Sequence, residues 1–196
     1  MQNLTKASQE LFRRTPDETF PSLEVLSAHC RQEHEEATEL WQPPKGMWAR
    51  PVGADHLMLA HEQGEDYRMT DWSFGQLCQL AGVTKSTVNR LSPDTAARVF
   101  AETLPHGDKP LQVYTVGEQA RAIHGASYTR LYNAELLEMI RECADGFEPP
   151  PVGFNGATGL YCGEQDMFLF LIDPTGWVEI EGESFAPGMF LWKSYP

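Results

Sequence analysis

The chain is short of basic residues. It has 15 lysines and arginines against 28 aspartates and glutamates, which gives a formal net charge of -13. Nonspecific nucleic-acid binding comes mostly from neutralising phosphates, so this negative charge works against loose attraction of the protein to polyphosphate. Any nucleic-acid contact must use a local basic patch. An acidic surface suits a basic protein partner equally well, and can imitate nucleic acid to one.

Cysteines are also few, and long apolar runs are absent. The cysteines lie far apart without a Cys-x-x-Cys pair, which excludes a disulfide framework and predicts reduced, mostly buried thiols: Cys30, Cys78, Cys143 and Cys162. No run approaches the roughly 18 apolar residues of a membrane span, and the N-terminus lacks the apolar core of a signal peptide. We therefore expect a soluble, cytoplasmic protein that does not bind membranes.

The length of 196 residues, with 41% hydrophobic residues, is enough for a sizeable core. Residues 1–21 are polar and predict a flexible N-terminal segment. Residues 22–196 predict a single α+β domain, with a helical subregion at 70–104 and a sheet-rich subregion at 111–194. In the latter, a mixed, mainly antiparallel sheet would pack against a helix.

Residues 22–41 show apolar spacing typical of a helix. Its outer face is strongly acidic and comprises Glu33, Glu35, Glu36 and Glu39. The simplest interpretation is a solvated helix face. The alternative is a contact surface for a basic partner.

The same segment contains possible metal ligands. Cys30 and His34 lie four residues apart on one helix face, and His29 and Glu33 on the next. A closed zinc site needs four ligands of suitable geometry. Because no second cluster with convincing spacing occurs in the sequence, we predict no metal and no cofactor.

Residues 70–91 resemble a helix-turn-helix, with a turn at Gly82. Lys85 and Arg90 would then face outward, where they could contact phosphates or base edges. Two helices joined at a glycine also arise as ordinary core, so both interpretations stay open.

The densest group of hydrogen-bonding side chains follows a predicted β-hairpin at 111–115 and 119–124. The chain turns at Gly125 and then enters a helix at 134–144, for which Asn133 is the expected cap. The predicted binding surface here comprises Arg121, Tyr128, Arg130 and Tyr132. Guanidinium groups beside aromatic rings suit the phosphates and bases of single-stranded nucleic acid. In the structural alternative, Arg130 pairs with a carboxylate such as Glu135 and the tyrosines close the core.

The remaining sequence predicts a long loop at 145–159, rich in proline and glycine, and then strands at 160–162, 167–172, 177–181 and 189–193. We find no catalytic motif. Ser127 near His124 lacks both a nucleophile elbow and an orienting acid, and the glycine-rich stretch 153–159 lacks the Lys-Ser/Thr of a phosphate-binding loop. These absences favour a non-enzymatic protein.

Several sequence blocks resemble the DUF932 group of phage- and plasmid-encoded proteins. They are FGQLCQLAG at 74–82, RAIHG at 121–125 with YTRLYNAE at 128–135, DMFLFLID at 166–173 and GMFLWKS at 188–194. The resemblance implies a mobile-element origin and an α+β fold, but no established reaction. Members of the group usually continue well beyond the last block, and commonly have Asn where this chain has Lys193, so this chain resembles a shortened member.

Two functions follow from these observations. The first is an accessory protein of phage or plasmid DNA metabolism that binds nucleic acid through Arg121, Tyr128, Arg130 and Tyr132, with Lys85 and Arg90 as a secondary patch. The second is an acidic inhibitor that binds and blocks a basic host complex of defence or DNA processing, using Glu33, Glu35, Glu36 and Glu39.

Overall fold

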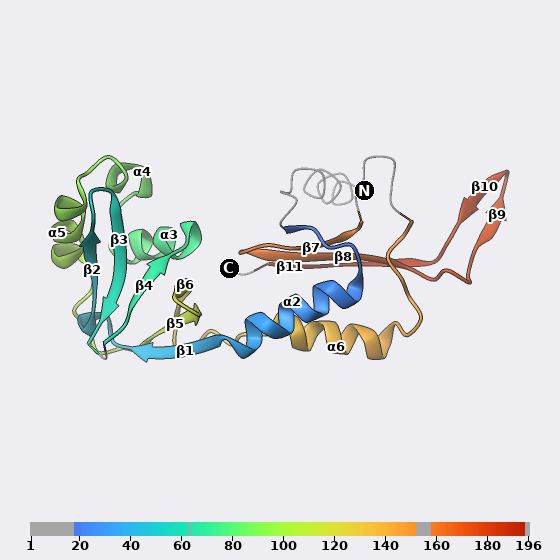
Figure 1. Cartoon of the computed structure of the whole chain (residues 1–196), viewed down its shortest axis with the longest axis horizontal. Coiled ribbons are helices and arrows are strands. Elements are labelled where there is room, and N and C mark those ends of the chain that lie inside the picture. Colours follow the sequence, from blue (N-terminus) through green and yellow to red (C-terminus); the bar gives the residue numbers. More distant parts are fainter. Residues whose placement is uncertain (1–17, 63, 152–157, 195–196) are drawn as a thin grey trace. The chain divides into compact units, whose positions relative to one another are not determined.

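The computed structural model describes residues 18–62, 64–151 and 158–194, and it confirms the α+β class (Figure 1). The chain forms two compact units. We call Glu35–Arg130 the inserted unit, and the residues up to His34 together with those from Leu131 onward the terminal unit. The sequence predicts one domain from residue 22, whereas the structure has a separate hydrophobic core in each unit. Most of the predicted flexible segment 1–21 lies outside the described residues.

The inserted unit is built on a six-stranded sheet with the order β1-β5-β6-β4-β3-β2. The strands are β1 (Ala37–Gln42), β2 (Met47–Val52), β3 (His56–His61), β4 (Asp66–Met69), β5 (Leu111–Val116) and β6 (Gln119–Gly125). All pairs are antiparallel except β4 with β6. The 3₁₀ helix η2 (Pro44–Gly46) connects β1 to β2. The predicted hairpin at 111–124 is thereby confirmed.

Three helices pack on one face of this sheet: α3 (Asp71–Leu80), α4 (Lys85–Val88) and α5 (Pro93–Thr103). The hydroxyls of Thr70, Thr84 and Ser92 cap them, each accepting a backbone N–H from the first turn. Leu77 and Phe100 are fully buried in the resulting core. The predicted helical subregion is confirmed, although its second helix is only one turn long.

The predicted helix over 22–41 is wrong in its second half. Helix α2 (Leu23–Glu35) ends there, Glu36 lies in a turn, and β1 begins at Ala37. All six residues of β1 pair with β5, far along the chain, and this pairing overrides a local helical pattern. The four glutamates therefore do not form one helix face.

The terminal unit packs α2 and α6 (Asn133–Cys143) beneath a three-stranded antiparallel sheet, β11-β8-β7 (Figure 1). The strands are β7 (Leu160–Cys162), β8 (Asp166–Ile172) and β11 (Gly188–Ser194). Leu26 and Leu137 from the helices meet Met167, Leu169 and Leu171 from β8 in the core. These strands match the sequence predictions closely.

Helix α6 starts differently from the prediction. Tyr132, not Asn133, is the N-cap, and the Glu135 carboxylate accepts the backbone N–H of Tyr132 at 3.4 Å. The side chain of Asn133 turns inward instead. It donates to the sulfur of Cys162 at 3.4 Å and accepts from the Lys193 ammonium at 2.7 Å.

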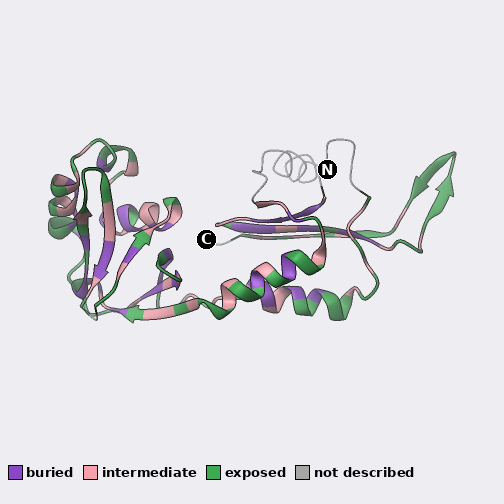
Figure 2. Cartoon of the chain, in the orientation of Figure 1, coloured by how far each residue is buried: buried purple, intermediate pink, exposed green. Residues whose placement is uncertain are grey.

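A second, separate sheet joins β8 to β11: the hairpin of β9 (Val178–Ile180) and β10 (Glu183–Phe185). Glu181 and Gly182 form its two-residue turn with positive φ angles of 54° and 85°, the type I′ pattern that suits strand twist. Every residue of both strands is exposed (Figure 2). Within the described ranges, no helix has the length and apolarity that crossing a membrane requires.

Candidate functional site

The segment after β6 returns over the sheet of the inserted unit. Tyr128 stacks on His124 with ring centroids 3.9 Å apart and planes 18° apart. The guanidinium carbon of Arg130 lies 3.7 Å from the centre of the Tyr114 ring and 5.4 Å from that of Tyr128. Its Nε lies 4.0 Å from a carboxylate oxygen of Glu39.

This arrangement hides the cation on which the predicted nucleic-acid surface depends. The Arg130 side chain is only 2% exposed, so its guanidinium faces the tyrosine ring and Glu39 rather than solvent. Arg121 donates instead to the Gln119 side chain at 3.4 Å, where the register between β5 and β6 shifts. The geometry is that of the structural alternative, with Glu39 in place of Glu135 as the carboxylate.

The other predicted nucleic-acid-binding residues are divided between the two units. Tyr132 belongs to the terminal unit, where it stacks on His34 with centroids 3.9 Å apart. Lys85 forms an ion pair with the Asp71 carboxylate and donates to the Asp71 carbonyl, so its charge is compensated. Arg90, just after α4, is exposed. The six predicted residues therefore do not form one surface within either unit.

His124 is a buried, neutral group in this cluster. Burial, and then the nearby charge of Arg130, lower the pKa of His124 from 6.5 to about 4. Its Nε2 has no hydrogen-bond partner among the described residues, and neither has Oε1 of Gln112, its cross-strand neighbour on β5. Protonating the buried ring at low pH therefore lowers the free energy of unfolding.

Acidification is expected to destabilise the inserted unit through His124. In the unfolded state His124 has a pKa near 6.5 and binds the proton more tightly than in the folded state. The stability that neutral His124 contributes is therefore complete above about pH 6.5 and is lost as the pH falls to about 4. The expected loss is on the order of 3 kcal/mol. Denaturant unfolding between pH 7 and 4 measures it. His124→Gln should flatten this dependence and His56→Gln, at an exposed position, should not; equal slopes for both variants and the parent would contradict the assignment.

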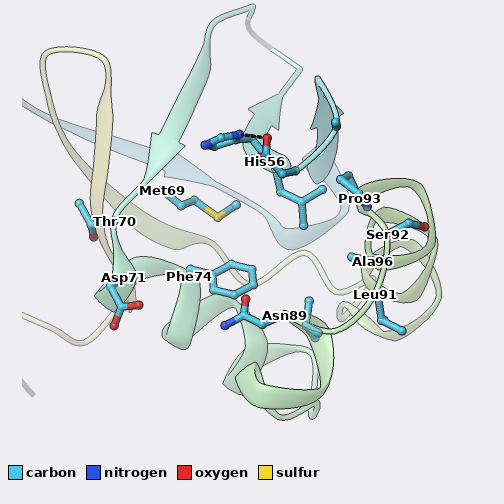
Figure 3. A pocket seen from close by; sticks show the side chains of 14 residues that line it. His56, Met69, Thr70, Asp71, Phe74, Asn89, Leu91, Ser92, Pro93 and Ala96 are labelled. Carbon is cyan, nitrogen blue, oxygen red and sulfur yellow. Dashed lines mark hydrogen bonds and ion pairs between the residues drawn. The ribbon is translucent and has the colours of Figure 1, made fainter.

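A pocket of about 430 Å³ lies between strands β3 and β4 and the three helices of the inserted unit (Figure 3). Phe74 and Met69 line its interior. Most of its polar rim is engaged within the fold: Thr70 and Ser92 cap helices, Asp71 pairs with Lys85, and His56 pairs with Asp55. We therefore do not place the functional site there.

The acidic charge is concentrated in the terminal unit. Residues 1–34 and 131–196 contain 16 acidic and 6 basic residues, whereas residues 35–130 contain 12 and 9. Between Arg141 and Lys193 the sequence has nine acidic residues and no lysine or arginine. The terminal unit therefore carries most of the net negative charge.

The same stretch carries four exposed large apolar side chains on one hairpin. We call Trp177–Phe185, which contains β9 and β10, the hairpin surface. Its apolar residues are more than half exposed: Trp177 51%, Val178 54%, Ile180 57% and Phe185 51%. Strand register places Val178 opposite Phe185 and Ile180 opposite Glu183, so one side of the ribbon is mostly apolar.

A two-stranded hairpin alone is marginally stable in water, and exposed apolar patches mark interaction sites. Three glutamates, Glu179, Glu181 and Glu183, belong to the same hairpin. Strand register places Glu183 on the mostly apolar side and Glu179 on the other side. The hairpin surface therefore combines aromatic rings with a high density of negative charge, and it is our candidate functional site.

Sequence reasoning missed this surface because it assigned 177–181 to an ordinary strand of the sheet. Two signals were present in the sequence. Glu181-Gly182 between short alternating runs is a turn pattern, and no basic residue balances the acids around it.

Comparison with protein-family models, curated proteins and solved structures finds no match to this chain. The resemblance to the DUF932 group therefore stays a prediction, and the chain is assigned to no family.

Proposed function

We propose that the protein binds a basic protein partner through the hairpin surface and blocks that partner's access to nucleic acid, as an acidic inhibitor in the cytoplasm. One observation carries the proposal. Four large apolar side chains are more than half exposed on a hairpin within a stretch that has no basic residue.

The chemistry of the hairpin surface indicates the kind of partner. Buried aromatic anchors supply most of the binding energy at protein interfaces, and Trp177 and Phe185 are available for this role. The glutamates attract a positive surface and oppose a negative one. A groove that binds nucleic acid offers cations for phosphates and platforms for bases, so carboxylates beside aromatic rings fit such a groove.

Site-specific crosslinking tests the proposal. In one sample a photoreactive phenylalanine analogue replaces Phe185. In the matched control it replaces Arg98, an exposed residue of α5. After irradiation in lysate, the captured chains are identified, purified and titrated with the unlabelled protein. We expect the Phe185 probe alone to capture a basic nucleic-acid-binding protein, and expect nucleic acid to compete with the purified complex. Equal capture at both positions, or simultaneous binding of nucleic acid, would refute it.

A second candidate, single-stranded nucleic-acid binding, is favoured by the sheet of the inserted unit. Trp41 and Trp48 are 48% and 41% exposed. Each alternates with residues of the buried core, so both lie on the sheet face away from the helices. Strand register aligns Arg50 with Met58 and Arg68 on that face. Arg50 is paired with Asp66, which weakens this candidate.

Titration of a labelled single-stranded oligonucleotide at low salt separates the candidates. We expect no binding at concentrations of about tens of micromolar, because the net charge opposes phosphate and Arg130 is buried. Binding that disappears when Trp41 and Trp48 are both changed to alanine would instead support the second candidate.

A further inference from the structure

The terminal unit brings together three side chains with metal-binding chemistry. His29 and Glu33 lie one turn apart on α2, and Cys162 ends β7. One ligand atom from each lies within 4.8 Å of the other two. The His29 Nε2 and Glu33 Oε2 atoms are 3.8 Å apart.

These distances between ligand atoms are close to the distances found between the ligands of one bound metal ion. Zinc bonds of about 2.0 to 2.3 Å in tetrahedral geometry place ligand atoms about 3.3 to 3.8 Å from each other. His29 and Glu33 are only partly buried, so their side chains have room to rotate toward a bound ion.

Two neighbouring side chains contact the Cys162 sulfur. The Cys30 thiol, also buried, donates to the Cys162 sulfur at 4.0 Å. Asn133 donates to the Cys162 sulfur, and Lys193 holds the Asn133 amide oxygen. Such outer contacts are typical of metal sites, where they fix the ligands.

We propose that His29, Glu33 and Cys162 bind a zinc ion in the terminal unit. Thiolate with imidazole and carboxylate suits zinc and related transition metals, and a thiolate disfavours calcium and magnesium. The hydrogen bond with Cys30, and then burial, raise the pKa of the Cys162 thiol well above its usual value, so the metal must displace a proton to bind. The zinc site would tie α2 to the sheet, and it does not depend on the proposed partner binding.

Cobalt substitution tests the site because thiolate ligation gives Co²⁺ an absorption band in the near ultraviolet. The full chain is reduced, kept without oxygen, and titrated with CoCl₂ and then with ZnCl₂. We expect one Co²⁺ per chain, a thiolate band that zinc removes, and a thermal midpoint that rises with zinc concentration. A reduced chain that shows no thiolate band on addition of CoCl₂ would overturn the proposal.

Substitutions locate the ligands. Cys162→Ser should remove the thiolate band, and His29→Gln and Glu33→Gln should each weaken Co²⁺ binding at least about tenfold. Two variants serve as matched controls: Cys143→Ser, which removes an exposed thiol of the same unit, and His34→Gln, which removes the ring that stacks on Tyr132. Both should bind Co²⁺ like the parent. His29 and Glu33 are not core residues, so their variants test the site even if Cys162→Ser fails to fold. Unchanged affinity in both, or loss of the band in Cys143→Ser, would overturn the assignment.

Discussion

Replacing both Trp177 and Phe185 with alanine is expected to weaken binding of the proposed basic partner at least about 100-fold. Interface aromatics commonly contribute about 2 kcal/mol or more each when truncated, and tenfold in affinity corresponds to about 1.4 kcal/mol. Both side chains are about half exposed in the free chain, so their loss should leave the fold intact. Calorimetric titration with the purified partner measures the effect, and circular dichroism checks the fold.

The matched control changes two equally exposed apolar residues of the same unit. Val25 on α2 and Met139 on α6 are 47% and 51% exposed, and their double alanine variant should change the affinity less than about threefold. If the control loses as much affinity as the hairpin variant, binding depends on general apolar exposure and not on the hairpin surface.

Reversing the charge of Glu179 and Glu183 to lysine is expected to slow association with the partner about 10- to 100-fold at low salt. Complementary charge raises association rates by roughly one to three orders of magnitude, and salt screens this effect. The difference between variant and parent should therefore shrink as salt is added. Stopped-flow association across a salt series measures both the rate and its salt dependence.

The control for charge reversal alters the net charge equally but in the inserted unit. Glu102 and Glu118 are exposed there, and their double lysine variant should associate nearly as fast as the parent. Equal slowing in both variants would show that total charge, and not the hairpin surface, attracts the partner.

Elements with strong periodicity could be predicted from the sequence. The hairpin of β5 and β6, the helix α6 and the apolar strand β8 all occur within a residue or two of the expected bounds. Their patterns are long, and turn or capping residues flank them. The same reasoning placed the helical subregion correctly, where Ser92 and Pro93 mark the start of α5.

The segment around Glu36 could not be predicted because its structure depends on distant residues. Apolar residues with helical spacing favour a helix through residue 41, yet β1 pairs with β5, where Gln42 lies opposite Leu111 and Ala37 opposite Val116. The division into two units is equally nonlocal, since the terminal unit is assembled from both ends of the sequence.

Side-chain convergence was the least predictable feature of the candidate sites. Arg121, Tyr128 and Arg130 are close in sequence, but Arg130 folds inward onto Tyr114. Conversely, Cys162 is distant in sequence from His29 and Glu33 but lies beside them in the structure. Local spacing alone therefore predicted one cluster that does not form a surface, and it gave no reason to group Cys162 with His29 and Glu33.

Hydrogen–deuterium exchange of the complex with the purified partner tests the central claim most directly, because it locates the contact on this chain. The account predicts that backbone amides of residues 177–185 become protected on binding, while those of β1 and β2 exchange as in the free protein. Protection confined to β1 and β2, with the hairpin surface unchanged, would contradict it.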